Sequence, residues 1–485
     1  KKRIFLIWNG PQSEVSQMIE GLKLRGHRVV YYIGNASNYG EVPNLSGIVY
    51  HEDYEARFGR PAKGIEANDF PPPASELLTK LHKAESLILT MMNRKVDSPD
   101  NPMTMDEKKH FFYDLVRYWH GVLLKFKPDV IIFPAVPHNV SNFTIYSLAK
   151  ALGVKTIIFQ ETWASDRILM QYDYQSTAPF LPEAIKRRAK GNYTPNDLDP
   201  DLKDYFTIQT TPELDATPLD VKELLIEEQK ISLLVRTYRR IKLIWASLLD
   251  LSIFIRVYRF IKRRFGENLK TEYERLETMP DLSKNFVYVP LHWQPECTTS
   301  PLGEIYADQL LALETIADSL PDGWKIYVKE HPFQWSVDGV YDYTNMRYRG
   351  YYRRLAKLPN VSLIPVTFDT FELERKARAV ATITGRAAIE GVFRGTPALI
   401  FGFPWYMDMP GIFRIKDALS CQEALSKIKN GFRPDKKDIL RYLKAFGEVT
   451  IRGYLDPFAE KNSPFTPKET IEHVLSILLP ELELT

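Results

Sequence analysis

The sequence of 485 residues is too long for one ordinary hydrophobic core, so it predicts at least two domains. Hydrophobic residues make up 44% and charged residues 26%, which is the composition of a globular protein. The two cysteines, Cys297 and Cys421, are too few and too far apart for a disulfide framework or a cysteine metal site. The net charge of +3 is uneven, because residues 230–264 hold ten Lys or Arg and one Asp, or +9. The remainder is then 3 − 9 = −6, which is mildly acidic.

The N-terminal part of the chain alternates between short apolar runs and segments with helical spacing. Strands are expected at 2–8, 28–34, 129–133 and 155–159, and helices at 14–25, 77–92, 105–126 and 141–152. Repeated strand–helix–strand units predict a doubly wound α/β domain over residues 1–217. Within it, 51–105 is expected to be irregular apart from the helix at 77–92, and 172–217 to be loop and linker, because proline, asparagine and aspartate are frequent there.

Three further regions come after this domain. Residues 218–279 are expected to form a basic amphipathic helical insertion. Residues 280–445 repeat the strand–helix pattern and predict a second α/β domain. Residues 446–485 read as helices that pack back toward the first domain, and no internal repeat of a solenoid period is present.

Two polar loops follow two apolar strands in the second domain, one after 287–290 and one after 325–329. Ligands of open α/β sheets bind outside the carboxyl ends of the strands, so these loops are expected to form half of an active site. Lys329 and His331 share one face of a strand, and two donors at this edge suit a phosphate or carboxylate. The alternative is a strand end with solvated polar residues. The loop at Gln294 is either a sugar-binding loop or a plain turn.

A second anion site is expected where the strand at 379–383 turns into a helix. The N-terminus of a helix offers free N–H groups and a positive dipole end, which favour phosphate. Thr384 is expected to cap this helix, Gly385 to let a ligand approach the backbone, and Arg386 to add charge. Glu390, one turn further on, suits a ribose hydroxyl. The alternative is an ordinary capped helix with Glu390 paired to an arginine.

The first domain offers a carboxylate at the end of the strand that precedes Thr162. Glu161 at the carboxyl edge of a sheet is a natural general base toward an acceptor hydroxyl, and His138 ends the neighbouring strand. The alternative is an ion pair between Glu161 and Arg167. The loop after the first strand, beginning at Asn9, has one glycine and no G-x-G-x-x-G motif, so it is expected to face a ligand other than a dinucleotide.

The basic segment 230–264 interleaves apolar and aromatic residues with Lys and Arg at helical spacing. Such helices lie on anionic membrane surfaces, whereas Asp250 in the apolar part argues against a spanning helix. The alternative is an interdomain helix pair with a solvated basic face. Nucleic acid is the weakest candidate, because the rest of the chain is acidic and shows no recognition motif.

The pairing of Gln294-Pro295 with His331-Pro332 resembles the bacterial capsule polysaccharide biosynthesis family, which includes β-Kdo transferases; bacterial sialyltransferases share the His-Pro element. The resemblance is most specific over 286–405 and looser over 1–165. It implies a GT-B-like α/β fold, in which two facing Rossmann-type domains enclose a deep cleft.

The resemblance also implies roles for individual residues. His331 would stabilise the departing nucleotide phosphate, Gln294 would contact the donor sugar, and the segment from Thr384 to Glu390 would hold phosphate and ribose. The nucleotide base would lie against the backbone of 365–368, which includes Phe368. The family's general base is in an acidic-acidic-Gly motif, whereas this chain has Glu161-Thr162-Trp163. His138 and Asn9 would lie on the acceptor side.

The expected activity is that of an inverting glycosyltransferase of surface polysaccharide synthesis. It would use a CMP-activated ulosonic acid such as Kdo and a glycan or lipid-linked acceptor, with no metal or other cofactor, because no D-x-D motif stands where a metal would be needed. A cytoplasmic location, peripheral on the inner membrane, is expected from the basic helices. The alternatives are a UDP-sugar transferase, an epimerase, and a non-catalytic assembly or export component.

Overall fold

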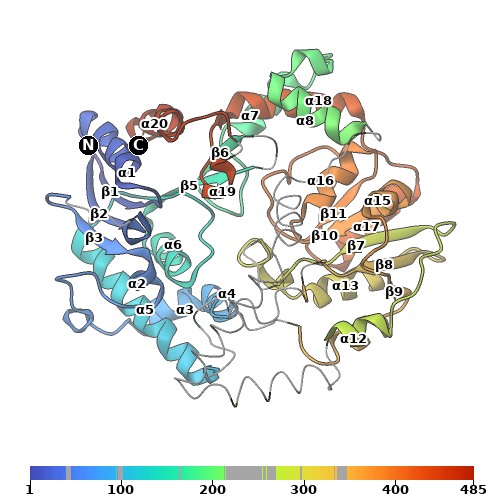
Figure 1. Ribbon diagram of the computed structural model, residues 1–485, viewed down its shortest axis with the longest axis horizontal. Helices are drawn as coiled ribbons and strands as arrows, with labels where there is room; N and C mark the ends of the chain where they lie inside the picture. The colour runs from blue at the N-terminus through green and yellow to red at the C-terminus, as the bar shows by residue number, and fades with distance from the viewer. Residues whose placement is uncertain are drawn as a thin grey trace, which may run out of the picture.

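The computed structural model of the protein describes residues 1–39, 45–93, 96, 102–162, 164, 166–211, 214, 254, 258, 269–294, 298–332, 334–335, 347–461 and 463–484. The described residues form two α/β halves, each built around its own sheet (Figure 1). This confirms the predicted arrangement of two Rossmann-type domains. The basic segment 230–264 lies outside the described residues, except for Phe254 and Tyr258, so its predicted helices and membrane contact stay predictions.

The N-terminal sheet has seven strands in the order β13-β6-β5-β4-β1-β2-β3. The pairs from β3 to β5 are parallel, and β6 is antiparallel to both β5 and β13. The strands are β1 (Arg3–Ile7), β2 (Arg28–Gly34), β3 (Val49–Glu52), β4 (Val130–Phe133), β5 (Lys155–Glu161), β6 (Arg167–Gln171) and β13 (Thr450–Arg452).

Alternate residues of β1 face opposite cores, as the twofold period of a strand requires. Ile4 and Leu6 pack in one cluster with α1 (Gln12–Leu24) and α20 (Pro467–Glu483). Phe5 and Ile7 pack in the other with α5 and α6. The helices of this domain are α2 (Asp53–Arg57), α3 (Ser75–Lys80), α4 (His82–Met91), α5 (Met105–Phe126), α6 (Val140–Leu152) and α19 (Pro457–Glu460), in addition to α1 and α20.

The C-terminal sheet is parallel throughout its six strands, in the order β12-β11-β10-β7-β8-β9. Its strands are β7 (Phe286–Pro290), β8 (Lys325–Lys329), β9 (Val361–Leu363), β10 (Ala379–Thr382), β11 (Ala398–Ile400) and β12 (Ile412–Arg414). Its helices are α12 (Leu269–Glu274), α13 (Gln309–Asp318), α14 (Tyr351–Ala356), α15 (Thr370–Lys376), α16 (Arg386–Phe393), α17 (Ala418–Lys429) and α18 (Lys436–Val449). A parallel sheet needs cover on both faces, and these helices provide it.

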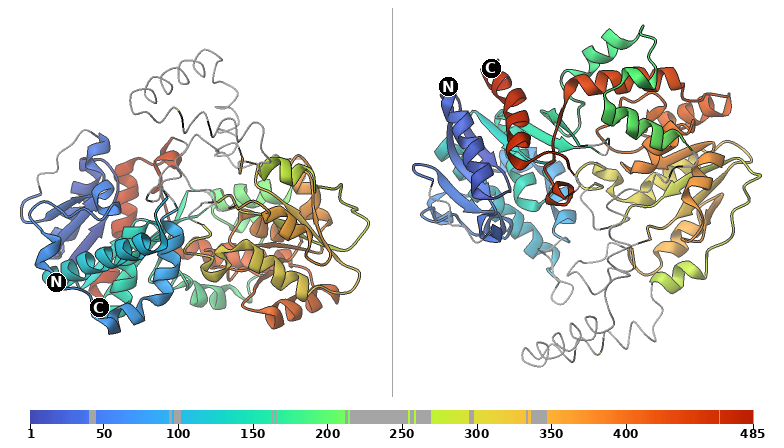
Figure 2. Two further views of the ribbon diagram at one scale, coloured as in Figure 1. Left: turned by 90° about the horizontal axis from the view of Figure 1, so that it is seen from below. Right: turned by 45° about the horizontal axis from the view of Figure 1, so that its top comes forward.

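The expectation of a loop and linker over 172–217 is wrong for its helical part. Residues there form α7 (Leu181–Arg188) and α8 (Pro200–Thr210), which lie beside α18 in Figures 1 and 2. Leu181 and Phe206 belong to a core cluster of the C-terminal half. Two of the prolines that suggested a linker, Pro182 and Pro200, instead stand in the first turns of the two helices, where the missing N–H costs nothing.

Several short elements were also missed. The region predicted to be irregular contains β3 and α2, and the predicted helix at 77–92 is divided into α3 and α4. The strands β12 and β13 are each three residues long, too short for a period-2 pattern to identify them.

The C-terminal helix α20 completes the N-terminal domain by packing beside α1 (Figure 1). Leu478 in α20 is 0% exposed, whereas Leu484 at its end is 75% exposed. We expect Leu478→Ala to lower the free energy of unfolding by about 2–5 kcal/mol, because the lost side chain leaves a cavity. Leu484→Ala is expected to change it by less than ~0.5 kcal/mol. Denaturant unfolding of both variants measures this, and equal effects would show that α20 is not part of this core.

Candidate functional site

The order of the C-terminal sheet brings the predicted donor-binding loops together. Pro290 at the end of β7 pairs with Lys329 at the end of β8, and β10 lies on the other side of β7. The loops after these three strands therefore leave the same edge side by side. They contain Gln294, His331 and the segment from Thr384, and one hydrogen-bond network connects the first and the last of these loops.

His292 is at the centre of this network. Its Nε2 accepts hydrogen bonds from the hydroxyl of Thr382 at 2.9 Å and from the backbone N–H of Thr384 at 3.3 Å. These two donors place the imidazole proton on Nδ1, which lies 3.4 Å from the Thr298 hydroxyl. With 8% of its surface exposed, His292 is a structural residue that fixes the turn before α16.

The helix α16 begins at Arg386 with Gly385 as its N-cap, and no side chain caps it. The expectation that Thr384 caps the helix is therefore wrong, because its hydroxyl donates to the Thr298 carbonyl at 2.9 Å. A Cβ atom on Gly385 would lie 2.7 Å from the hydroxyl oxygen of Thr382, so glycine is required there. With no side-chain cap, the N-terminus of α16 presents its positive dipole end at this turn, which favours an anionic ligand.

Glu390 lies one turn into α16, with 8% of its surface exposed. Its charge acts on Tyr205, on Tyr406 and on the buried Glu374, whose pKa is raised by burial and then by Glu390. Glu390 thus sits in a buried group of acids and tyrosines beneath the turn. Arg386 at the start of the helix is half-buried.

Lys329 is 6% exposed, and two of its three N–H groups are used inside the protein. They donate to the Phe368 carbonyl at 2.6 Å and to the Thr370 hydroxyl at 2.7 Å. Burial lowers the pKa of Lys329 to about 8. Lys329 therefore fixes the 365–370 loop, where the nucleotide base was expected to lie. This role replaces the predicted one, in which Lys329 donates to a phosphate next to His331.

His331 lies at the start of the loop after β8 and is half-buried. Its ring stacks on Trp293, with ring centroids 6.5 Å apart and an interplanar angle of 22°. The backbone N–H of His331 donates to the Glu330 carboxylate at 2.8 Å. The ring therefore lies against a residue of the neighbouring loop, and Glu330 holds the backbone of His331.

Sequence reasoning missed a buried ion pair beneath these loops. The Nε atom of Arg347 lies 3.1 Å from the Glu330 carboxylate, and both side chains are at most 1% exposed. Arg347 also donates to the Gln294 side-chain oxygen at 2.6 Å and to the His292 carbonyl at 2.9 Å. Tyr352 donates to Glu330 at 2.6 Å. The sequence did indicate that the side chains of Glu330 and His331 point to opposite sides of the strand. It contained no pattern that would have identified Arg347, 17 residues after Glu330, as the partner of that carboxylate.

Glu161 ends β5 on the N-terminal side. Its carboxylate accepts hydrogen bonds from the backbone N–H groups of Asp456 at 3.0 Å and Leu455 at 3.4 Å. Burial raises the pKa of Glu161 to about 7, and these hydrogen bonds oppose the rise. The alternative ion pair with Arg167 is wrong, because Arg167 pairs with Asp199 at 2.6 Å and with Asp201 at 2.7 Å.

The other two predicted residues on this side lie in the loops after β4 and β1, and the expectation that His138 ends a strand is wrong, because β4 ends at Phe133. His138 is held by its own turn, with Nδ1 2.8 Å from the Val136 carbonyl, so Nδ1 carries a proton. Asn9 is exposed in the loop after β1. His138 and Asn9 therefore lie at the same edge of the sheet as Glu161, since β1, β4 and β5 are parallel.

Glu14 in α1 is a second carboxylate whose pKa is raised to about 7, by burial and by the charge of Glu460. Its folded pKa is above the ordinary value of 4.5, so the fold opposes ionisation and the protein loses stability as pH rises from 4.5 through 7. We expect Glu14→Gln to stabilise the protein at pH 8 by ~1–2 kcal/mol, after allowance for solvent screening, and to have little effect at pH 4. Unfolding at the two pH values measures this; a gain equal at both would contradict it.

The two halves meet next to the donor-side loops. Glu304, which follows the 298–303 loop, forms an ion pair with Lys83 of α4 at 2.8 Å and accepts from Gln175 and Tyr174. Leu302 joins the hydrophobic core of the N-terminal half. The loop that contacts the turn before α16 is thus also an interdomain contact.

Neither a metal cluster nor a spanning helix is found in the part of the chain that the structure describes. The described residues contain no group of three or more His, Cys, Asp or Glu side chains placed to hold a metal ion. None of their helices combines the length and the apolar character that crossing a membrane needs. The metal-free reaction and the membrane-surface contact both stay predictions.

Residues 298–437 match the family model described as "Capsule polysaccharide biosynthesis protein". The predicted resemblance is confirmed over this range, which includes His331 and the segment from Thr384 to Glu390. Gln294-Pro295 lies just before it. A comparison with curated proteins gave no significant match.

Among solved structures, the chain is similar to the β-Kdo 2,7 transferase KpsC of Thermosulfurimonas dismutans, with 11% identity, a TM-score of 0.32, and 84% of this chain and 97% of that chain covered. It is also similar to the UDP-GlcNAc 2-epimerase of Methanocaldococcus jannaschii, with 13% identity, a TM-score of 0.26, and 92% and 99% covered.

Proposed function

We propose that this protein is an inverting, metal-independent glycosyltransferase of surface polysaccharide synthesis. The observation that carries the proposal is the family match over 298–437, because it spans His331 and the uncapped start of α16. Sequence and geometry thus point to one edge of the C-terminal sheet. The donor would be a nucleotide sugar, most consistently a CMP-activated ulosonic acid such as Kdo, and the acceptor a glycan or lipid-linked glycan.

The proposed reaction is a single displacement. The Glu161 carboxylate removes the proton of the acceptor hydroxyl, the hydroxyl oxygen attacks the anomeric carbon, and the bond from that carbon to the nucleotide phosphate breaks. Negative charge develops on the leaving phosphate. His331, Arg386 and the N-terminus of α16 would stabilise it, in place of a metal ion. The Lys329-tethered loop at 365–370 would hold the nucleotide base.

Nucleotide preference is the direct test of this proposal. Thermal shifts with CMP, UDP and GDP are measured first, followed by nucleotide release from CMP- and UDP-activated sugars in the presence of acceptor glycans. CMP is expected to raise the melting temperature most, and release of CMP is expected to need an acceptor. Turnover of UDP-sugars alone would contradict the CMP donor, and a UDP-sugar altered without acceptor would indicate an epimerase. No response to any nucleotide would favour a non-catalytic role.

The assigned role of His331 is tested by His331→Ala. Removal of one donor that stabilises the leaving phosphate is expected to lower kcat by about 100-fold. His110→Ala is the matched control, because His110 is exposed on α5, and its kcat should be unchanged. Unchanged turnover in His331→Ala would remove His331 from the mechanism while leaving the family match intact.

The basic segment 230–264 is proposed to hold the enzyme on an anionic membrane surface, where a lipid-linked acceptor would be located. Its ten Lys or Arg residues against one Asp support this. Deletion of the segment is expected to weaken flotation with anionic vesicles while release of CMP with a soluble acceptor persists.

A further inference from the structure

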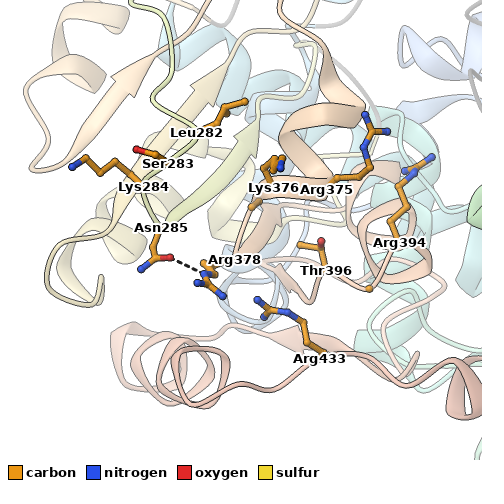
Figure 3. Close-up of a pocket in the computed structure, with 12 residues that line it drawn as sticks. Leu282, Ser283, Lys284, Asn285, Arg375, Lys376, Arg378, Arg394, Thr396 and Arg433 are labelled. Atoms are coloured by element: carbon orange, nitrogen blue, oxygen red, sulfur yellow. Dashed lines mark hydrogen bonds between the residues drawn. The ribbon is translucent and has the colours of Figure 1, made fainter. Parts of the chain in front are cut away.

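A pocket lies at the opposite edge of the C-terminal sheet from His331. It has a volume of about 420 Å³, and residues that come just before three strands are part of its lining. Asn285 precedes β7, Arg378 precedes β10, and Thr396 lies just before β11 (Figure 3). Because all three strands are parallel, this amino-terminal edge is separated by the length of the sheet from the proposed donor site.

Half of the twelve residues that line the pocket are cationic, and none is acidic. Arg394 is neutralised by Glu374 at 2.7 Å, but the other five cations are exposed. The presence of two of these cations is explained by a helix end, since Arg375 and Lys376 stand in the last turn of α15, where cations complement the helix dipole. The helix dipole does not explain the other cations of the pocket, which lie outside the helices. The six cations are Lys284, Arg375, Lys376, Arg378, Arg394 and Arg433.

Arg378 and Arg433 come from different elements and face one another across the pocket (Figure 3). The Nε of Arg378 donates to the Asn285 side-chain oxygen at 2.7 Å, which fixes the direction of its guanidinium. Burial and then the charge of Arg378 lower the pKa of Arg433. Two like charges held toward each other at an exposed site repel, and an anion between them would remove that repulsion.

We propose that this pocket binds a phosphate-bearing anion, either a lipid headgroup or a soluble phosphate compound. A guanidinium fork matches two phosphate oxygens, and two forks from opposite walls suit a group with more than one negative charge. The pocket volume admits a diphosphate or one phosphorylated headgroup. This site is independent of the proposed glycosyl transfer, because it shares no residue with the donor-side loops.

The test compares the whole protein with the double variant Arg378→Gln/Arg433→Gln. Both residues are exposed, so the fold is expected to persist, and circular dichroism checks this. The matched control is Lys23→Gln/Lys80→Gln, which removes the same charge from exposed positions of the N-terminal half. Pyrophosphate binding is measured by calorimetry, and vesicle binding by flotation with phosphatidylglycerol in phosphatidylcholine.

The double variant is expected to bind one of these probes about 10- to 30-fold more weakly than the wild type, and the control to stay within about twofold. Loss confined to vesicles identifies a headgroup, and loss of pyrophosphate binding identifies a soluble phosphate. His331→Ala should leave this binding unchanged, which separates the pocket from the donor site. Equal binding by the double variant, an equal loss in the control, or no binding of either probe by the wild type would overturn the proposal.

Discussion

Glu161→Gln is expected to lower kcat/KM for glycosyl transfer by about 100- to 10,000-fold, because glutamine cannot accept the proton of the acceptor hydroxyl. The substitution keeps the size of the side chain and one oxygen, so the hydrogen bonds from Leu455 and Asp456 have an acceptor. The variant should therefore fold, and its thermal shift with CMP should equal that of the wild type. Initial rates with saturating donor measure the loss.

The pH dependence of the wild type gives a second readout of the same residue. Burial raises the pKa of Glu161 to about 7, so the carboxylate that acts as base is present above this pH and is lost below it. We expect kcat/KM to fall about tenfold for each pH unit below 7 and to level off above it. A rate that is constant between pH 5 and 8 would contradict the assignment.

Glu14→Gln is the matched control, because Glu14 has the same raised pKa near the same sheet edge. Its rate and pH profile should match those of the wild type, while its stability at pH 8 increases. If Glu14→Gln loses activity and Glu161→Gln does not, the base is Glu14, and the rest of the donor-side proposal is unaffected.

Much of the donor side could be predicted because local patterns specify it. Apolar runs end in polar residues at 290–294 and 329–332, and the parallel order of β8, β7 and β10 places the loops after these strands at one edge. Gly385 was expected only to let a ligand approach the backbone, whereas the structure shows that a side chain there would also collide with the Thr382 hydroxyl.

The direction of long polar side chains could not be predicted from the sequence. Lys329 looked like a ligand donor, but its ammonium group donates to the Phe368 carbonyl and to the Thr370 hydroxyl in the loop that follows β9. Similarly, the environment of Glu161 depends on residues 455–456, nearly 300 positions away. No local sequence pattern connects segments that are so far apart in the chain. Neither the contact of Glu161 with residues 455–456 nor its raised pKa could therefore be predicted.

The largest stability effect is expected from Arg347→Met, which removes the cation buried beneath the donor-side loops. Burial opposes the charge of Arg347, but Glu330 outweighs it, so the pKa of Arg347 is raised. Without Arg347 the Glu330 carboxylate is left buried beside Tyr352, and loss of one partner of such a pair costs about 3–5 kcal/mol. Denaturant unfolding measures this cost.

The control for this prediction is Arg354→Met. Arg354 also pairs with a glutamate at 3.1 Å, but 58% of its side chain and 37% of that of Glu314 are exposed. A surface pair of this kind contributes ~0–1 kcal/mol, so equal losses in both variants would mean that burial of the Glu330 pair does not matter.

A double variant shows whether Arg347 acts only through Glu330. If the cost of Arg347→Met is the unpaired carboxylate, then adding Glu330→Gln should recover part of the stability, because a neutral amide is cheaper to bury than a charge. We expect Arg347→Met also to weaken nucleotide binding, and the double variant not to restore it, since Gln294 and the His292 carbonyl still lack the donor that fixes their loop. Recovery of stability without recovery of the CMP thermal shift would therefore assign Arg347 two separable tasks, neutralising Glu330 and positioning the loop that carries Gln294.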